Sequence, residues 1–188
     1  IGFFGGEPLL EFELLKKITA LVENHPSFNS ERVELSVVTN GTVFSDEIAE
    51  YLMKHNIGFC VSCDGPPVVH DVFRCFPDGR GSSSIVGKTL SQAVNFFPSV
   101  LVNAVYHPKT LDHLPLVVEY FSLLGLKQIY LNPDFSASWS KKEADSLPEI
   151  YDRIGKRYIE FYQQKKPHYI SLIDGKIAVI LRGGYKPQ

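Results

Sequence analysis

The sequence has no long uninterrupted apolar run and little excess charge. Hydrophobic residues make up 44% of its 188 positions, yet no stretch approaches the roughly twenty apolar residues that span a membrane. The 19 Lys and Arg residues nearly balance the 21 Asp and Glu residues, and the basic ones are scattered. We therefore expect neither a membrane protein nor a nucleic-acid-binding protein. No segment resembles a signal peptide, so a cytoplasmic location is expected.

Cysteine is also scarce. The three cysteines, Cys60, Cys63 and Cys75, cannot form a complete disulfide framework, and they suit a reducing compartment. Cys60 and Cys63 have CxxC spacing within a strand-like run. Residues three apart on a strand face opposite sides, which disfavours a shared metal ion, and a redox pair would require a helix N-terminus. We expect buried structural thiols and no metal site built from this chain.

Several common catalytic motifs are missing. The sequence contains no GxSxG, P-loop, HExxH or GxGxxG pattern. These absences disfavour serine hydrolases of the α/β type, P-loop nucleotidases, zinc proteases and dinucleotide-binding enzymes. An ordinary nucleotide-binding α/β protein is disfavoured as well, because no glycine loop is present to hold phosphates.

Strand-like runs alternate with helical periodicity along the chain. We expect strands at 1–4, 33–38, 58–63, 100–106 and 128–132, and helices from Pro8, from Ser45 to about His55, at 85–97, around 114–124, and through 147–161. A long polar loop is expected at 64–83. This order predicts an α/β fold with a parallel sheet, either a barrel or an open doubly wound sheet. The chain begins on an apolar strand at Ile1, so we interpret it as a piece of a longer polypeptide.

In either architecture the functional residues follow the carboxyl ends of the strands. Gly5 and Gly6 end the first strand and expose bare backbone carbonyls, which with the Glu7 carboxylate would suit a cationic ammonium group. The alternative is a tight turn with Glu7 as a solvated acid, and for the glycines alone this alternative is favoured. Polar residues recur after the other strands, however, and the whole pattern favours a convergent site.

The third strand raises a similar choice. Ser62 and Asp64 are two residues apart and share a face with Cys60, as residues lining a ligand would. Equally, the segment from Asp64 to Pro67 could be an Asp-initiated turn, and both interpretations remain open. His107 could act as a general base or simply start a loop. His70 and Asp71 are expected in a loop or a short helix that leans over the site. Other candidates, which could each hold a ligand carboxylate, are Arg74, Arg80 and Lys88.

The segments "FFGGEPLL", "TNGT" and "VSCDGPPVVHDVFR", in this order, resemble the radical S-adenosylmethionine (radical SAM) superfamily. The similarity is to the branch with anaerobic sulfatase maturases and other peptide-modifying enzymes that carry a C-terminal auxiliary-cluster (SPASM-type) domain. It implies a partial (β/α)6 TIM-like barrel with parallel strands, truncated before the second strand. Residues 1–140 would form the radical SAM core, and 141–188 the last barrel helix and a linker toward the SPASM-type domain.

The resemblance also implies SAM-binding residues. Gly5, Gly6, Glu7 and Pro8 would bind the methionyl amino group, and Ser62 the SAM carboxylate or ribose. Lys88 would take roughly the place of a carboxylate-binding Arg, although Lys is a point charge rather than a bidentate fork. Asn40 and Asp64 would face the substrate or the ribose region, and Asn132 would line the cavity from the last strand. The resemblance assigns no catalytic acid or base to this chain.

The cofactors implied are SAM and a 4Fe–4S cluster. The cluster-binding CxxxCxxC motif of the family precedes GGEP and does not occur in this chain, which should therefore do no radical chemistry by itself. The parent enzyme would modify a peptide or protein and receive electrons from a flavodoxin- or ferredoxin-type donor. The alternative is a non-catalytic scaffold that binds a peptide or a partner domain. Near the end, Asp174 caps a short helix by analogy, or Asp174-Gly175 forms a hairpin turn.

Overall fold

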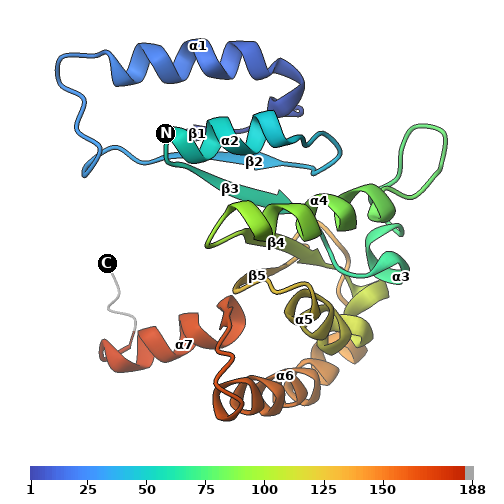
Figure 1. The fold of residues 1–188 in the computed structure, drawn as a ribbon. Helices are drawn as coiled ribbons and strands as arrows, with labels where there is room; N and C mark the ends of the chain where they lie inside the picture. The colour runs from blue at the N-terminus through green and yellow to red at the C-terminus, as the bar shows by residue number, and fades with distance from the viewer. Residues whose placement is uncertain (185–188) are drawn as a thin grey trace.

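The computed structural model describes residues 1–184 and contains one sheet of six parallel strands. The strands lie in the order of the sequence, so each pairs with its predecessor (Figure 1). Their bounds are β1 (Gly2–Phe3), β2 (Leu35–Thr39), β3 (Ile57–Ser62), β4 (Leu101–Tyr106), β5 (Gln128–Pro133) and β6 (Tyr169–Ile170). The predicted α/β fold is confirmed. In the described part of the chain no pairing joins β1 to β6, so the barrel is partial.

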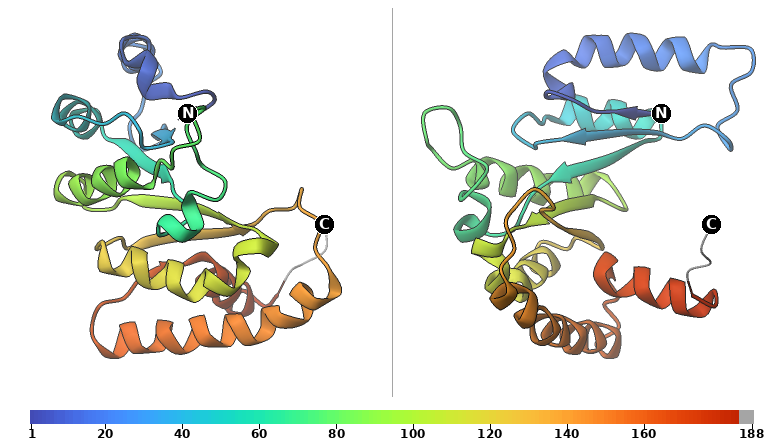
Figure 2. Two further views of the ribbon diagram at one scale, coloured as in Figure 1. Left: turned by 90° about the vertical axis from the view of Figure 1, so that its right-hand side faces the viewer. Right: turned by 180° about the vertical axis from the view of Figure 1, so that it is seen from behind.

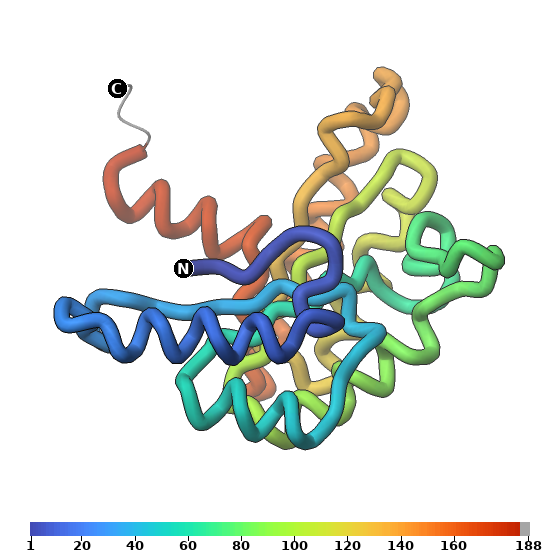
Figure 3. The backbone as a smooth tube through the Cα atoms, turned by 90° about the horizontal axis from the view of Figure 1, so that it is seen from above, coloured from blue at the N-terminus to red at the C-terminus, as the bar shows by residue number. Residues whose placement is uncertain are grey.

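Helices connect successive strands and cover one side of the sheet. Figure 2 shows α1, α2, α4, α5 and α6 following one another along this side. The helices are η1 (Pro8–Glu11), α1 (Phe12–Glu23), α2 (Asp46–Lys54), α3 (Pro67–His70), α4 (Ser83–Phe96), η2 (Pro108–His113), α5 (Leu114–Leu123), α6 (Lys141–Gln163) and α7 (Ser171–Leu181). Figure 3 shows β1 and the end of α7 on the same side of the molecule.

The strands bury every second residue beneath these helices. In β4, Val102, Ala104 and Tyr106 are buried, whereas the alternate residues Leu101 and Asn103 are half-buried on the opposite, concave face. β2, β3 and β5 alternate in the same way over most of their length. This period of two follows from strand geometry, and it sends one face of each strand into the core and leaves the other for a ligand.

The helix-start signals in the sequence have the expected effect. Ser45 caps α2, because its Oγ accepts a hydrogen bond from the Ile48 N–H at 3.3 Å. The acids Asp46 and Glu47 occupy the first turn, and the helix ends before His55 as predicted. The segment from Pro8 is a 3₁₀ turn that leads into α1.

The apolar stripe of this first helical segment does not form its buried face. Leu10, Leu14 and Leu21 are 70%, 52% and 74% exposed, whereas Leu15 and Thr19 are buried. Helical spacing was predicted correctly, but spacing alone does not say which side meets the sheet. Leu10 and Leu14, with Ile18, line an open cavity of about 460 Å³ beside the glycine turn.

Two further details differ from the sequence-based prediction. The two-residue strand β6 was not predicted. Within the polar loop at 64–83, the short helix α3 ends at His70, as one of the two alternatives expected there. The hairpin alternative at Asp174-Gly175 is wrong, because α7 runs through both residues. Asp174 Oδ2 accepts the Ile170 N–H at 2.7 Å and so satisfies a backbone donor at the helix start. The end of the "LRGGYKPQ" segment, 185–188, lies outside the described residues.

Candidate functional site

Glu7 is fixed between the ends of β1 and β2. Its Oε1 accepts hydrogen bonds from Thr39 Oγ1 at 2.7 Å and from the Leu9 N–H at 3.1 Å. Its Oε2 accepts the Asn40 N–H at 2.7 Å. Thr39 is buried, and its hydroxyl oxygen also accepts the Gly41 N–H at 3.0 Å. The carboxylate therefore has a defined position, set by two neighbouring strand ends.

Gly5 and Gly6 present an open stretch of backbone next to this carboxylate. Their φ angles are +97° and +53°, in the region that side chains disfavour, and a Cβ on either would meet no atom within 4 Å. The cavity of about 460 Å³ is lined by Gly2 to Pro8 together with one side of α1. Pro8 begins η1 directly after the turn. The structure thus brings the whole GGEP segment to one open shelf.

Asn40 lies beside Glu7, in agreement with the expectation that the carboxyl ends of the strands meet at one edge. Its backbone N–H bonds to the Glu7 carboxylate, and its own Oδ1 accepts the Thr42 N–H at 2.8 Å and Thr42 Oγ1 at 2.7 Å. The side chain of Asn40 is exposed. Its Nδ2 group has no hydrogen-bond partner within residues 1–184, so two N–H donors face the open edge.

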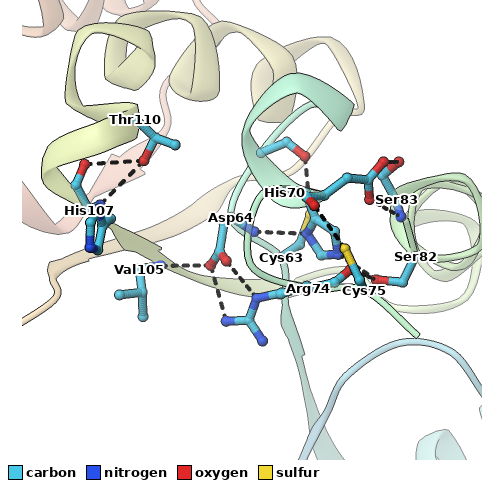
Figure 4. Close-up of polar contacts among 12 residues, drawn as sticks. Cys63, Asp64, His70, Arg74, Cys75, Ser82, Ser83, Val105, His107 and Thr110 are labelled. Atoms are coloured by element: carbon cyan, nitrogen blue, oxygen red, sulfur yellow. Dashed lines mark hydrogen bonds and ion pairs between the residues drawn. The ribbon is translucent and has the colours of Figure 1, made fainter. Parts of the chain in front are cut away.

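Asp64 lies after β3 in a buried ion pair rather than in an open position (Figure 4). Its carboxylate accepts Arg74 Nε at 2.6 Å, Arg74 Nη2 at 3.1 Å and the Val105 N–H at 2.9 Å. The Asp64 side chain is 5% exposed and that of Arg74 is 31% exposed. The pair joins the end of β3 to β4, and the guanidinium is the part of it that a ligand can reach.

His70 helps to position this ion pair by bonding to the backbone of Asp64. Its Nδ1 accepts the Asp64 N–H at 3.2 Å, and its Nε2 lies 2.9 Å from Ser82 Oγ. Because the Ser82 hydroxyl donates to the Arg74 carbonyl at 2.7 Å, Nε2 is the donor and His70 is neutral (Figure 4). Burial lowers the pKa of His70. Sequence reasoning placed His70 over the site but did not find these partners.

A polar row crosses the concave face at the ends of β3, β4 and β5. Ser62 and Asn103 are directly paired in the parallel register, and Asn103 pairs in turn with Tyr130. Asn132 Nδ2 donates to Asn103 Oδ1 at 2.8 Å. Sequence analysis missed Asn103, although the alternation in "VLVNAVY" places it on the concave face and so could have found it.

The remaining candidates do not join this group. Lys88 is exposed on α4, and the structure does not tie it to the strand-end residues by any hydrogen bond or ion pair in the described range. Arg80 pairs with Asp78 in an exposed loop. His107 follows β4, where its Nδ1 accepts the Lys109 N–H at 3.0 Å and its ring packs on Phe73.

The three cysteines are separate free thiols. Cys60 is half-buried, Cys63 is buried and Cys75 is exposed, so the expectation of buried thiols is confirmed for Cys63 and wrong for Cys75. Burial raises the pKa of Cys60 to about 11 and that of Cys63 to about 12, so neither is a ready thiolate. Within residues 1–184 no three Cys, His, Asp or Glu side chains gather as a metal site would require. Among the same residues, no helix is long and apolar enough to cross a membrane.

Together the fold and the site define a partial parallel α/β barrel with an open shelf at the carboxyl ends of its first strands. No family model matches the chain. An uncharacterized protein of Methanocaldococcus jannaschii is 28% identical over 189 residues, which cover 96% of this chain and 64% of that protein. The radical SAM cyclopropyl synthase TigE of Paramaledivibacter caminithermalis is 27% identical over 142 residues, 75% of this chain and 29% of the synthase.

A cysteine-type anaerobic sulfatase-maturating enzyme of Clostridium perfringens is 24% identical over 96% of this chain and 51% of that enzyme. The solved structure of anSMEcpe with bound AdoMet and Cp18Cys peptide has a TM-score of 0.81 at 22% identity, over 99% of this chain and 54% of that one. The relatives with a named activity are thus radical SAM and sulfatase-maturating enzymes, and the resemblance seen in the sequence is confirmed. The chain spans less than two thirds of each of these proteins.

Proposed function

We propose that this chain is the SAM-binding part of a radical SAM enzyme that modifies a peptide or protein, in the manner of a sulfatase maturase. The observation that carries the proposal is the shelf of Gly5, Gly6 and Glu7, held by Thr39 and Asn40. Support also comes from the radical SAM cyclopropyl synthase and from the sulfatase-maturating enzyme, whose solved structure holds AdoMet and a peptide.

The shelf fits the methionyl ammonium of SAM. A carboxylate offers about four acceptor positions, and hydrogen bonds from Leu9, Thr39 and Asn40 use three of those on Glu7. The remaining position can accept one ammonium N–H, while the carbonyls of Gly5 and Gly6 can accept the others. Pro8 starts η1 immediately after the turn and so fixes the direction in which the chain leaves the shelf.

Other residues would hold the rest of SAM and the substrate. We assign the SAM ribose or carboxylate to Ser62, the ribose or substrate region to Asn40 and Asp64, and the cavity wall to Asn132. Asp64 would act through Arg74, since its own carboxylate is buried. Lys88 remains a proposed carboxylate ligand, which would have to extend from the exposed side of α4 to reach the site.

The 4Fe–4S cluster, when bound, supplies the electron that cleaves SAM to a 5′-deoxyadenosyl radical. Residues 1–184 gather no ligand set for a cluster, so we propose that its cysteines lie outside this chain and that the 188-residue chain is inactive alone. Residues 1–140 would then be the radical SAM core, and 141–188 its last helix and a linker to a SPASM-type domain. A flavodoxin- or ferredoxin-type protein would donate the electron, and the free thiols suit the reducing cytoplasm.

The test is production of 5′-deoxyadenosine. The full-length protein would be purified without oxygen, loaded with iron and sulfide, and incubated with SAM and a reductant. We expect 5′-deoxyadenosine above a blank without reductant, and less of it from Glu7→Gln, with Glu50→Gln, at an exposed acid on α2, as the matched control. A protein that carries its cluster and yields none would contradict the enzyme assignment and favour a binding scaffold.

A further inference from the structure

The carboxamides of Asn103 and Asn132 form a pair on the concave face, away from the GGEP shelf. Asn132 Nδ2 donates to Asn103 Oδ1 at 2.8 Å, and the side chain of Asn132 is exposed at the end of β5. Neither side chain makes another hydrogen bond within the described residues. Two neutral polar groups are therefore fixed against each other while most of their hydrogen-bonding capacity faces the open side of the sheet.

The free groups of this pair match the backbone N–H and C=O of one extended residue, which point to the same side of a strand. Each carboxamide has two N–H donors and two acceptor lone pairs. After the bond between them, Asn132 Oδ1 remains as an acceptor and Asn103 Nδ2 as a donor, side by side on neighbouring strands. If oxygen and nitrogen are exchanged in both amides, one free acceptor and one free donor still remain. The acceptor then belongs to Asn103 and the donor to Asn132. An acceptor next to a donor is what a backbone N–H and a neighbouring C=O require.

Aromatic side chains lie on and after the strand next to Asn103, together with the polar row. Tyr130, beside Asn103 in the register, packs on Tyr169 with ring centroids 5.1 Å apart. At the rim, Phe73 is 47% exposed, and Phe135, three residues after Asn132, is 89% exposed. Exposed aromatic side chains beside polar groups are typical of surfaces that bind another polypeptide.

We propose that the Asn103–Asn132 pair hydrogen-bonds to the backbone N–H and C=O of one residue in an extended peptide substrate, with Phe73 and Phe135 covering the flanking side chains. The inference rests on the proposed function, because it names how that enzyme would hold its substrate. Recognition through the backbone is independent of side-chain sequence, so selectivity at this point comes from conformation. The reacting side chain is then placed relative to SAM by a fixed main-chain contact.

The experiment uses the full-length protein, loaded with its cluster and with SAM, and a fluorescein-labelled, cysteine-centred capped peptide. Peptide affinity is measured by anisotropy, and SAM affinity and 5′-deoxyadenosine formation are measured separately. The variants are Asn103→Leu and Asn132→Leu. Asn95→Leu is the matched control, because Asn95 lies exposed on α4 with its amide bonded to Ser91 O. A series of peptide esters replaces one backbone N–H at a time by oxygen.

We expect peptide affinity to fall roughly tenfold in each variant, as the loss of two neutral hydrogen bonds implies. The double variant should lose little more, since the two amides act as a unit. SAM affinity should stay within about twofold in Asn103→Leu. At one position, the ester should bind the parent protein more weakly than the normal peptide does. The same ester and the normal peptide should bind Asn132→Leu with equal affinity.

Three results would overturn the inference. The first is a parallel loss of SAM affinity in Asn103→Leu, which would assign the pair to the adenine edge of SAM. The second is an ester series in which no position depends on Asn132. The third is a parent protein that binds none of these peptides. In each case normal 5′-deoxyadenosine formation by the parent protein would leave the proposed radical SAM function intact, so the two failures are distinguishable.

Discussion

Thr39 connects two loops of the candidate site through one hydroxyl group. Its Oγ1 donates to Glu7 Oε1 at 2.7 Å and accepts the Gly41 N–H at 3.0 Å. Thr39→Val removes both bonds without a large change in volume. We expect a loss of about 1–3 kcal/mol in the free energy of unfolding, because the buried Gly41 N–H loses its partner. SAM affinity should fall about 3–10-fold, since Glu7 is no longer held.

Urea unfolding and calorimetric titration with SAM would measure these two effects. Thr39→Ser keeps the hydroxyl and serves as the control, so it should retain most of the SAM affinity. A Thr39→Val protein that binds SAM as tightly as the parent would show that Glu7 does not depend on this bond.

His70 gives the protein a defined response to acid. Burial lowers its pKa in the folded state below the ordinary value of 6.5. The unfolded chain therefore takes up a proton at a pH where the folded protein does not, and the free energy of unfolding falls as the pH drops through 6.5 toward the folded pKa. Above this window the neutral His70 contributes fully to stability.

Urea unfolding at about pH 7.5 and pH 5.5 would test this response across the titration range of histidine. The loss of stability at the lower pH should be smaller in His70→Asn than in the parent protein. His25→Asn, at an exposed histidine, should keep the parent's loss. An equal loss in His70→Asn and the parent would exclude His70 as its source.

Sequence reasoning found the polar residues of the site better than it found their partners. The order of strands and turns placed Gly5, Glu7, Asn40 and Ser62 on one edge, because the carboxyl ends of parallel strands meet there. It could not show that Asp64 is enclosed by Arg74, since two residues ten positions apart meet only through the turn at α3.

At the scale of elements, two glycines with left-handed φ angles have different reasons to be glycine. Gly65, with φ at +137°, lies between β3 and α3, and a Cβ there would come within 2.7 Å of Val117 Cγ2 in α5. Gly125, with φ at +79°, would place a Cβ in open space. Both Ala variants bear backbone strain, but only Gly65→Ala also forces α5 away from the loop.

We therefore expect the free energy of unfolding to fall by about 1–3 kcal/mol more in Gly65→Ala than in Gly125→Ala, because overpacking of a close contact costs about this much. Thermal or urea unfolding of both variants measures the difference. Equal losses would mean that Val117 moves aside without cost. Gly65→Ala combined with Val117→Ala should recover part of the loss, because the shorter side chain makes room for the Cβ.

Elements with a long periodic pattern were predicted from the sequence, and the short ones were not. α6 and β4 follow clear 3.6- and 2-residue periods, whereas β6 has only Tyr169 and Ile170, too few residues to show any period. α7 was left between helix and hairpin, because Gly175 is a turn residue by propensity. The bonds from Ile170 N–H and Tyr158 Oη to Asp174 help to stabilise the helix, and neither is visible in local sequence.

At the scale of the whole molecule, the proposed function requires the SAM shelf and the cluster ligands to come from different parts of the parent protein. The Glu7 carboxylate at the end of β1 has its hydrogen-bond partners in place, whereas Cys60, Cys63 and Cys75 form no ligand set within residues 1–184. Cys60 and Cys63 lie on opposite sides of β3 and are half-buried and buried, and Cys75 Sγ donates to the Asp71 carbonyl. A cluster requires thiolates that converge, and these thiols do not.

The full-length protein with Cys60→Ala, Cys63→Ala and Cys75→Ser should therefore keep its iron content and its rate of 5′-deoxyadenosine formation. Stability should fall by about 1–2 kcal/mol, because Ala leaves a small cavity at Cys63. Iron analysis, the visible spectrum of the cluster and product quantification measure these outcomes, and thermal unfolding measures the stability cost. Loss of iron in the triple variant would place a cluster ligand inside this chain, and single variants would then identify it. Retained iron and activity would mean that the cluster and the SAM shelf come from different segments of the polypeptide, brought together only when the barrel is assembled.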